Sequence, residues 1–161
     1  MRRMLLWFAA VVLGFAVPPV VFASPAHALP PGVRIQAGFA WAAGAYTCGK
    51  SSCVTMQHDG NFVLYKCDRY DRQFCEQDWG QGRHGPALWA TNTYRNSPPQ
   101  FFMTWQTDHN LVLYNQQLGV IWTTNTYKNA RMLILQDDGN FVIYDDNNTY
   151  AVWASNTAWC C

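Results

Sequence analysis

The sequence predicts an all-β fold of three small antiparallel sheets related by pseudo-threefold symmetry. A five-residue motif, Gln-x-Asp-x-Asn-x-Val-x-Tyr, occurs three times, and a tryptophan followed by Asn-Thr comes after every copy. No apolar stripe of helical period and useful length follows the first segment of the chain. Repeats of about thirty residues that cannot bury an apolar face alone favour a closed arrangement of three sheets. The motif copies are Gln57, Asp59, Asn61, Val63 and Tyr65; Gln106, Asp108, Asn110, Val112 and Tyr114; and Gln136, Asp138, Asn140, Val142 and Tyr144.

Each motif copy is predicted to form a β-hairpin. Apolar residues alternate before the glutamine and after the asparagine, which is typical of strands with one buried face. The Asp-x-Asn segment between them has the residue types of a hairpin turn. Folding there returns the glutamine beside the valine and the tyrosine, so five side chains can converge on one small ligand. The apolar positions are Val54, Met56, Phe62 and Leu64; Met103, Trp105, Leu111 and Leu113; and Leu133, Leu135, Phe141 and Ile143.

A tryptophan follows every hairpin at a comparable position, as Trp89, Trp122 and Trp153. Large aromatic side chains mostly lie in cores. We therefore expect these three tryptophans to form a shared core on the pseudo-threefold axis, rather than a platform for a ligand.

The first 28 residues are predicted to be a secretory signal peptide. Arg2 and Arg3 precede a nearly continuous apolar run, and Ala26-His27-Ala28 offers a small-x-small cleavage site. Cleavage after Ala23 is the alternative. Prolines within the apolar run argue against a membrane anchor. The mature protein is therefore expected to be secreted, either extracellular or periplasmic, without stable membrane insertion.

Charge and cysteine content narrow the class of protein further. Without residues 1–28 the chain has nine basic and ten acidic residues, and no run of lysine or arginine suggests nucleic-acid binding. In an exported chain, an even number of cysteines indicates disulfides. Cys48 with Cys53 and Cys67 with Cys75 are the economical local pairs. The adjacent Cys160 and Cys161 stay ambiguous, because they can hold the C-terminus or link two chains.

The motif side chains suit binding rather than catalysis. Gln, Asp, Asn and Tyr supply hydrogen-bond donors and acceptors without a strong nucleophile or base, beside one apolar valine. This set fits a neutral polyhydroxylated ligand, and a sugar is the obvious candidate. No nucleophile–base pair or metal-ligand spacing is evident, so we expect no enzyme activity, no metal and no cofactor.

The motif followed by Trp-x-x-Asn-Thr resembles the bulb-type, or monocot mannose-binding, lectins. The likeness runs from about Ile35 to Thr157, so residues 29–161 are expected to form one such domain. The resemblance implies a β-prism II fold around a tryptophan core, with up to three sites for α-mannose. It assigns the Asp and Asn to the axial 2-hydroxyl, the Gln and Tyr to the 3- and 4-hydroxyls, and the valine to the ring carbons. It also implies that a homodimer can form.

The expected function is thus a secreted lectin for α-mannose or mannose-containing glycans. The alternative is an exported antagonist or toxin that uses this fold to reach the surface glycans of a competitor. A tandem second domain would favour that alternative, whereas we expect residues 29–161 to form a single domain.

The first repeat departs from the other two. Tyr65 precedes Trp89 by 24 residues, whereas the corresponding distance is 8 residues in the second repeat and 9 in the third. We call the additional segment, about residues 67–86, the insert. One interpretation is a surface loop pinned by a disulfide. Another is that the insert extends the first site, with Trp79 stacking on a second sugar. The insert could equally obstruct that site.

Overall fold

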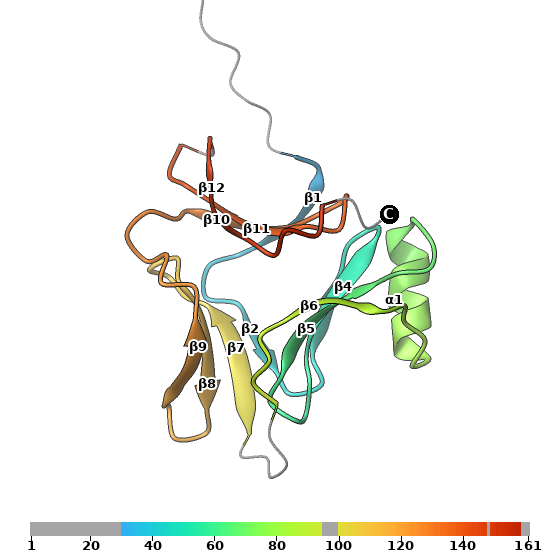
Figure 1. Ribbon diagram of the computed structural model, residues 1–161, viewed down its shortest axis with the longest axis horizontal. Helices are drawn as coiled ribbons and strands as arrows, with labels where there is room; N and C mark the ends of the chain where they lie inside the picture. Colours follow the sequence, from blue (N-terminus) through green and yellow to red (C-terminus); the bar gives the residue numbers. More distant parts are fainter. Residues whose placement is uncertain (1–29, 95–99, 148, 159–161) are drawn as a thin grey trace, which may run out of the picture.

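Three four-stranded antiparallel sheets surround a common core in the computed structural model, which describes residues 30–94, 100–147 and 149–158 (Figure 1). The predicted all-β fold with three sheets is therefore confirmed. The expected signal peptide, residues 1–28, and the pair Cys160 and Cys161 lie outside the described residues.

The sheets are named here after the repeat that each contains. The first sheet has the strand order β3-β4-β5-β6, the second β2-β7-β8-β9 and the third β1-β10-β11-β12. The strands are β1 (Gly32–Ile35), β2 (Ala40–Ala42), β3 (Tyr46–Cys48), β4 (Ser52–Met56), β5 (Phe62–Lys66), β6 (Ala87–Ala90), β7 (Phe101–Trp105), β8 (Leu111–Asn115), β9 (Val120–Thr123), β10 (Met132–Gln136), β11 (Phe141–Tyr144) and β12 (Ala151–Ala154).

Each repeat supplies three consecutive strands, and the fourth strand comes from the N-terminal part of the domain. β1 pairs with β10, β2 pairs with β7, and β3 pairs with β4. The segment before the first motif therefore contributes one strand to each of the three sheets and so links them. The repeat pattern alone did not predict these strands, because they are only three or four residues long and carry no motif.

The hairpins turn through a residue with a left-handed backbone. Gly60, His109 and Gly139 have φ values of 89°, 62° and 86°. A three-residue hairpin loop commonly ends in such a residue, which glycine adopts without steric cost. Histidine in the second repeat keeps the same backbone, so all three turns present their Asp and Asn alike.

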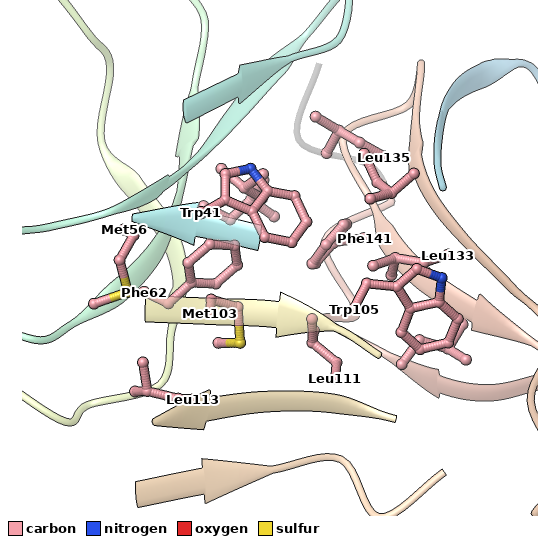
Figure 2. Close-up of a cluster of buried hydrophobic side chains, with 14 of the residues drawn as sticks. Trp41, Met56, Phe62, Met103, Trp105, Leu111, Leu113, Leu133, Leu135 and Phe141 are labelled. Carbon is pink, nitrogen blue, oxygen red and sulfur yellow. The ribbon is translucent and has the colours of Figure 1, made fainter. Parts of the chain in front are cut away.

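The apolar set predicted from the alternation forms the core. All of its members lie on the inner faces of the sheets and are essentially inaccessible to solvent. Trp41 on β2 is fully buried, and its ring meets Phe62 of the first sheet at 5.3 Å and Phe141 of the third at 6.5 Å. Figure 2 shows these rings beside Met103 of the second sheet. Trp41 therefore packs where the three sheets meet.

The three repeated tryptophans cluster as predicted. The rings of Trp89, Trp122 and Trp153 meet edge to face, with centroids 5.3–5.9 Å apart. They are only partly buried and pack against the main core. Among the tryptophans that the structure describes, the fully buried ones are instead Trp41 and Trp105, whose positions do not recur in the repeats.

The insert contains one short helix, which the lack of helical periodicity in the sequence did not predict. Helix α1 (Arg72–Gly80) begins after Asp71, whose side chain accepts hydrogen bonds from the backbone N–H groups of Gln73 and Phe74. Only Cys75 of the helix is buried. A helix with so little apolar surface leaves no periodic stripe in the sequence, and its N-cap aspartate was the available signal.

Two disulfides lie where the insert packs on the first sheet, one inside the β3–β4 hairpin and one inside the insert. The bonds Cys48–Cys53 and Cys67–Cys75 are the two pairs that sequence spacing favoured. Their sulfur atoms form a small second core with Trp79, and α1 packs on β3 and β4. In Figure 1, α1 stands outside the first sheet.

Within the residues that the structure describes, no helix has both the length and the apolar character needed to cross a bilayer.

Candidate functional site

The motif residues of each repeat lie on the hairpin that the two central strands of its sheet form. We call them site one (Gln57 to Tyr65), site two (Gln106 to Tyr114) and site three (Gln136 to Tyr144). In each site the glutamine Nε2 donates a hydrogen bond to the tyrosine Oη, at 2.8, 3.0 and 2.7 Å respectively. The folding-back predicted from the sequence therefore brings together the first and last residues of all three motifs.

A strand irregularity precedes every motif tyrosine. The register shifts between Leu64 and Tyr65, and at the same point before Tyr114 and Tyr144. A bulge of this kind bends a strand and redirects a side chain. The extra residue lies on the outer strand, as Leu88, Ile121 or Val152, whereas the strand of the tyrosine pairs in unbroken register with the strand before it.

The motif aspartates shape the turns. Asp59, Asp108 and Asp138 each accept, through Oδ1, the backbone N–H of the motif asparagine two residues later, at 2.9–3.0 Å. This local turn fixes the carboxylate at the exposed rim of the site. A carboxylate has about four acceptor positions, so one backbone hydrogen bond leaves Asp59 and Asp108 further acceptor capacity.

The motif asparagines are held by the Trp-x-x-Asn-Thr segment, a role that the sequence analysis did not assign. Asn61 Oδ1 accepts hydrogen bonds from Thr91 Oγ1 at 3.0 Å and from the Thr93 backbone N–H at 3.3 Å. Because Oδ1 is the acceptor, the Nδ2 group is left to donate to a ligand. Equivalent contacts hold Asn110, through Thr124 and Thr126, and Asn140, through Ser155 and Thr157.

The repeated asparagine of the Trp-x-x-Asn-Thr segment has a structural role. Asn92, Asn125 and Asn156 have φ values of 56°, 55° and 59°. Asparagine adopts this left-handed conformation more readily than most residues. The turn that it allows places the following threonine, whose hydroxyl donates to the backbone carbonyl of Gly60, His109 or Gly139. The two repeated motifs therefore form one hydrogen-bonded unit.

The motif valines are more enclosed than their expected contact with a sugar ring suggests. Val63, Val112 and Val142 are only 1–2% exposed. Each lies on an inner strand with a paired strand on both sides; Val63, for example, faces Thr55 and Ala90. The valines form the floor of the site and offer a ligand little surface.

Site three is more closed than the other two on the side of its glutamine. Gln136 is 3% exposed, whereas Gln57 and Gln106 are partly accessible. Gly32 on β1 lies directly opposite Gln136, with so little space that an added Cβ would come within 2.8 Å of the Gln136 Cα. The neighbouring Asp137 forms an ion pair with Lys50 at 2.8 Å, and this contact raises the pKa of the lysine.

Site one has a wall that comes from the insert. Trp79 and His84 place their ring centroids 5.4 and 4.3 Å from the ring of Tyr65. A cleft of about 420 Å³ runs from these rings to the motif residues Gln57 and Asp59. The insert therefore borders site one and leaves open space beside it.

The side chains assembled at each site are mostly neutral hydrogen-bonding groups. Hydrogen-bond donors and acceptors surround each shallow floor, and the aspartate is the one acidic member of each motif. Across the described parts of the chain, no three His, Cys, Asp or Glu side chains gather as a metal site requires.

Comparison with known proteins identifies the family. No protein-family model and no curated protein matches the chain. Solved structures match it well. A monomeric monocot mannose-binding lectin from Gastrodia elata has 33% identity and a TM-score of 0.58, covering 77% of this chain and 96% of its own. The mannose-specific agglutinin of snowdrop, complexed with methyl-α-D-mannoside, has 31% identity and a TM-score of 0.51, covering 69% and 87%.

A lectin from Allium sativum, at 26% identity and a TM-score of 0.54, covers 69% of this chain and 91% of its own. The fold and its three polar motifs thus define a lectin of the β-prism II class. The identity and coverage shared with the Gastrodia and snowdrop proteins place the chain in the monocot mannose-binding lectin family.

Proposed function

We propose that the protein is a non-catalytic lectin that binds α-mannose, alone or within glycans, through sites one, two and three. The observation that carries the proposal is the same hydrogen-bonded unit built three times: a Gln–Tyr pair, an aspartate turn and a braced asparagine. Family membership supports it, since the Gastrodia relative is described as mannose-binding and the snowdrop relative as mannose-specific.

Preference for mannose follows from the polar pair at the rim. Asp59 supplies an acceptor and Asn61 a donor, two residues apart on one turn. An axial 2-hydroxyl can satisfy both groups, whereas the equatorial 2-hydroxyl of glucose would leave them without partners. A site built to bond a hydroxyl discriminates strongly against a ligand that does not present it.

Each site alone should bind weakly, and the three together should bind well. Four or five hydrogen bonds, each contributing about 0.5–1.5 kcal/mol, give a site of roughly millimolar affinity. Three sites on one rigid body gain avidity for a branched mannan through multivalency. We expect tight retention on mannan and weak binding of methyl α-mannoside.

The test is the triple substitution Asp59→Ala, Asp108→Ala and Asp138→Ala. We expect it to abolish retention on a mannan column, and we expect the parent protein to elute with methyl α-mannoside but not with methyl α-glucoside. Asp146→Ala, which removes an exposed carboxylate outside the motif, is the matched control and should leave retention unchanged. Retention of the triple variant as tight as that of the parent would refute the site assignment.

Export and pairing of chains stay predictions of the sequence. N-terminal sequencing of the protein from the culture medium or periplasm tests cleavage after Ala28. Sedimentation equilibrium tests the homodimer.

A further inference from the structure

We propose that the insert makes site one a two-part site, in which the cleft beside Tyr65 receives a second sugar residue linked to the bound mannose. The apolar face of this second hexose would lie on the ring of Trp79. This inference rests on the proposed function of site one and goes beyond it by assigning an oligosaccharide preference to one of the three sites.

The cleft joins the motif to the insert. Its lining includes Gln57 and Asp59 from the motif, together with Trp79 and His84 from the insert. Its volume of about 420 Å³ falls within the range of about 300–1,000 Å³ that small-molecule sites occupy. A ligand held by the motif therefore has open, walled space next to it in the direction of the insert.

The wall has the chemistry that a sugar face requires. Trp79 is partly exposed and lies within an aromatic group, with centroids 5.7 Å from Tyr46 and 5.2 Å from His84. The face of an aromatic ring carries partial negative charge and attracts the weakly positive C–H bonds on the apolar side of a hexose. The exposed imidazole of His84 adds a hydrogen-bonding group for hydroxyls at the edge of the same sugar.

The wall is also held in place before a ligand arrives. The Cys67–Cys75 disulfide joins the two ends of the first part of the insert. Asp78, next to Trp79 in the sequence, accepts hydrogen bonds from Arg69 at 3.0 Å and from Arg83 at 2.7 Å. Preorganised groups lose less entropy on binding than mobile ones, so a fixed ring can contribute measurable selectivity.

Site two provides the natural comparison within the same molecule. Its tyrosine stacks on Phe102 of the sheet, with centroids 5.4 Å apart and planes at 24°. The connection that replaces the insert there is a short turn, in which Asn115 Oδ1 accepts the backbone N–H groups of Gln117 and Gly119. This turn carries no aromatic residue that could form a second wall.

The experiment isolates each site in an otherwise intact chain. In a site-one protein, Asp108→Ala and Asp138→Ala remove the other two sites; in a site-two protein, Asp59→Ala and Asp138→Ala do so. Isothermal titration measures the affinity of each protein for methyl α-mannoside and for α-linked dimannosides and trimannosides. Trp79→Ala, Trp79→Leu and Trp79→Phe are then added to both proteins, with melting temperature as the folding control.

We expect the site-one protein to prefer oligomannosides, and we expect Trp79→Ala and Trp79→Leu to lower that affinity by about three- to tenfold. Affinity for methyl α-mannoside should stay within about twofold, Trp79→Phe should keep most of the preference, and the site-two protein should not respond. Should Trp79→Ala fail to fold, the comparison of Trp79→Leu with Trp79→Phe decides the question.

Equal losses for the monosaccharide and the oligosaccharides would overturn the inference, because Trp79 would then act only by supporting Tyr65. Equal affinities of the parent site-one protein for both ligands would overturn it as well, while leaving the proposed function intact. A site-one protein that binds no mannoside at all would overturn both.

Discussion

Site one and site two have the same five side chains and different surroundings. Threonines hold the asparagine in both, two in site one and three in site two, and both pair the glutamine with the tyrosine. The tyrosine of site two stacks on Phe102 from its own sheet, whereas that of site one contacts Trp79 and His84 from the insert. The comparison separates two parts of the sequence: the repeats supply the motif side chains, and the connections between strands supply the residues that lie beside them.

The largest expected effect comes from the scaffold that both sites share. Trp41→Ala should lower the free energy of unfolding by about 3–5 kcal/mol, because it opens a cavity where the three sheets meet. Urea denaturation measures the loss of stability. Across the unfolding transition, mannoside binding should be lost in parallel at sites one and two. Selective loss at one site would contradict the shared-core interpretation.

An intermediate effect should separate the two sites cleanly. Asn61→Ala should abolish binding at site one and cost about 1–3 kcal/mol of stability, because it leaves the backbone N–H of Thr93 without its acceptor and removes one partner of the Thr91 hydroxyl. Asn110→Ala should do the same at site two only. Titration of the single-site proteins and urea denaturation measure the two effects.

Asn61→Asp is the matched control for that prediction. It keeps an oxygen at the Oδ1 position and removes the Nδ2 donors. Binding at site one should therefore fall while most of the stability is retained. A large loss of stability without a loss of binding would show that the asparagine is only structural.

The smallest expected effect concerns the insert alone. Hydrogen bonding to Arg69 is the main cause that lowers the pKa of Asp78, and Arg83 adds to it. A lowered folded-state pKa means that the stabilisation is present above the ordinary value of 3.8 and is lost as pH falls through the folded-state value. Asp78→Asn should therefore speed hydrogen exchange in α1 at pH 7, and its difference from the parent should vanish in acid.

Glu76→Gln provides the control for that prediction, because it removes the exposed Arg72–Glu76 pair on the same helix. Such pairs contribute little, so exchange in α1 should change less than with Asp78→Asn. Binding at site two should be unaffected by either substitution. A pH-independent effect of Asp78→Asn would show that charge on Asp78 does not hold the insert.

The sequence predicted the parts of the fold that repeat. Alternation around Val54 and Phe62 located the hairpins, and the repeated Trp89 located a cluster on the axis. Strands such as β2 (Ala40–Ala42) escaped prediction because they are short, and their place depends on residues far along the chain. Helix α1 escaped because a capping aspartate and a disulfide stabilise it in place of a broad apolar face.

The motif residues of the sites could be predicted from the sequence, but the residues that hold them in place could not. Thr91 and Thr93 recur in the sequence, yet their hydrogen bonds to Asn61 cross about thirty residues and need the fold to be seen. Likewise, spacing alone located the insert but could not place Trp79 beside Tyr65. Enclosure of the valines likewise depends on the pairing of a strand on each side, as Thr55 and Ala90 pair with Val63.

The N-terminal strands impose an order on folding. β3 pairs with β4, which follows it directly in the chain. Trp41 on β2 instead pairs with Met103, and Ile35 on β1 pairs with Leu133, which lies about a hundred residues later in the chain than Ile35. Such distant pairs form late, since closing a long loop costs entropy before any contact repays it. The strand that is synthesised first is therefore expected to dock last. Until it does, β10 is an open edge to which another chain could add a strand.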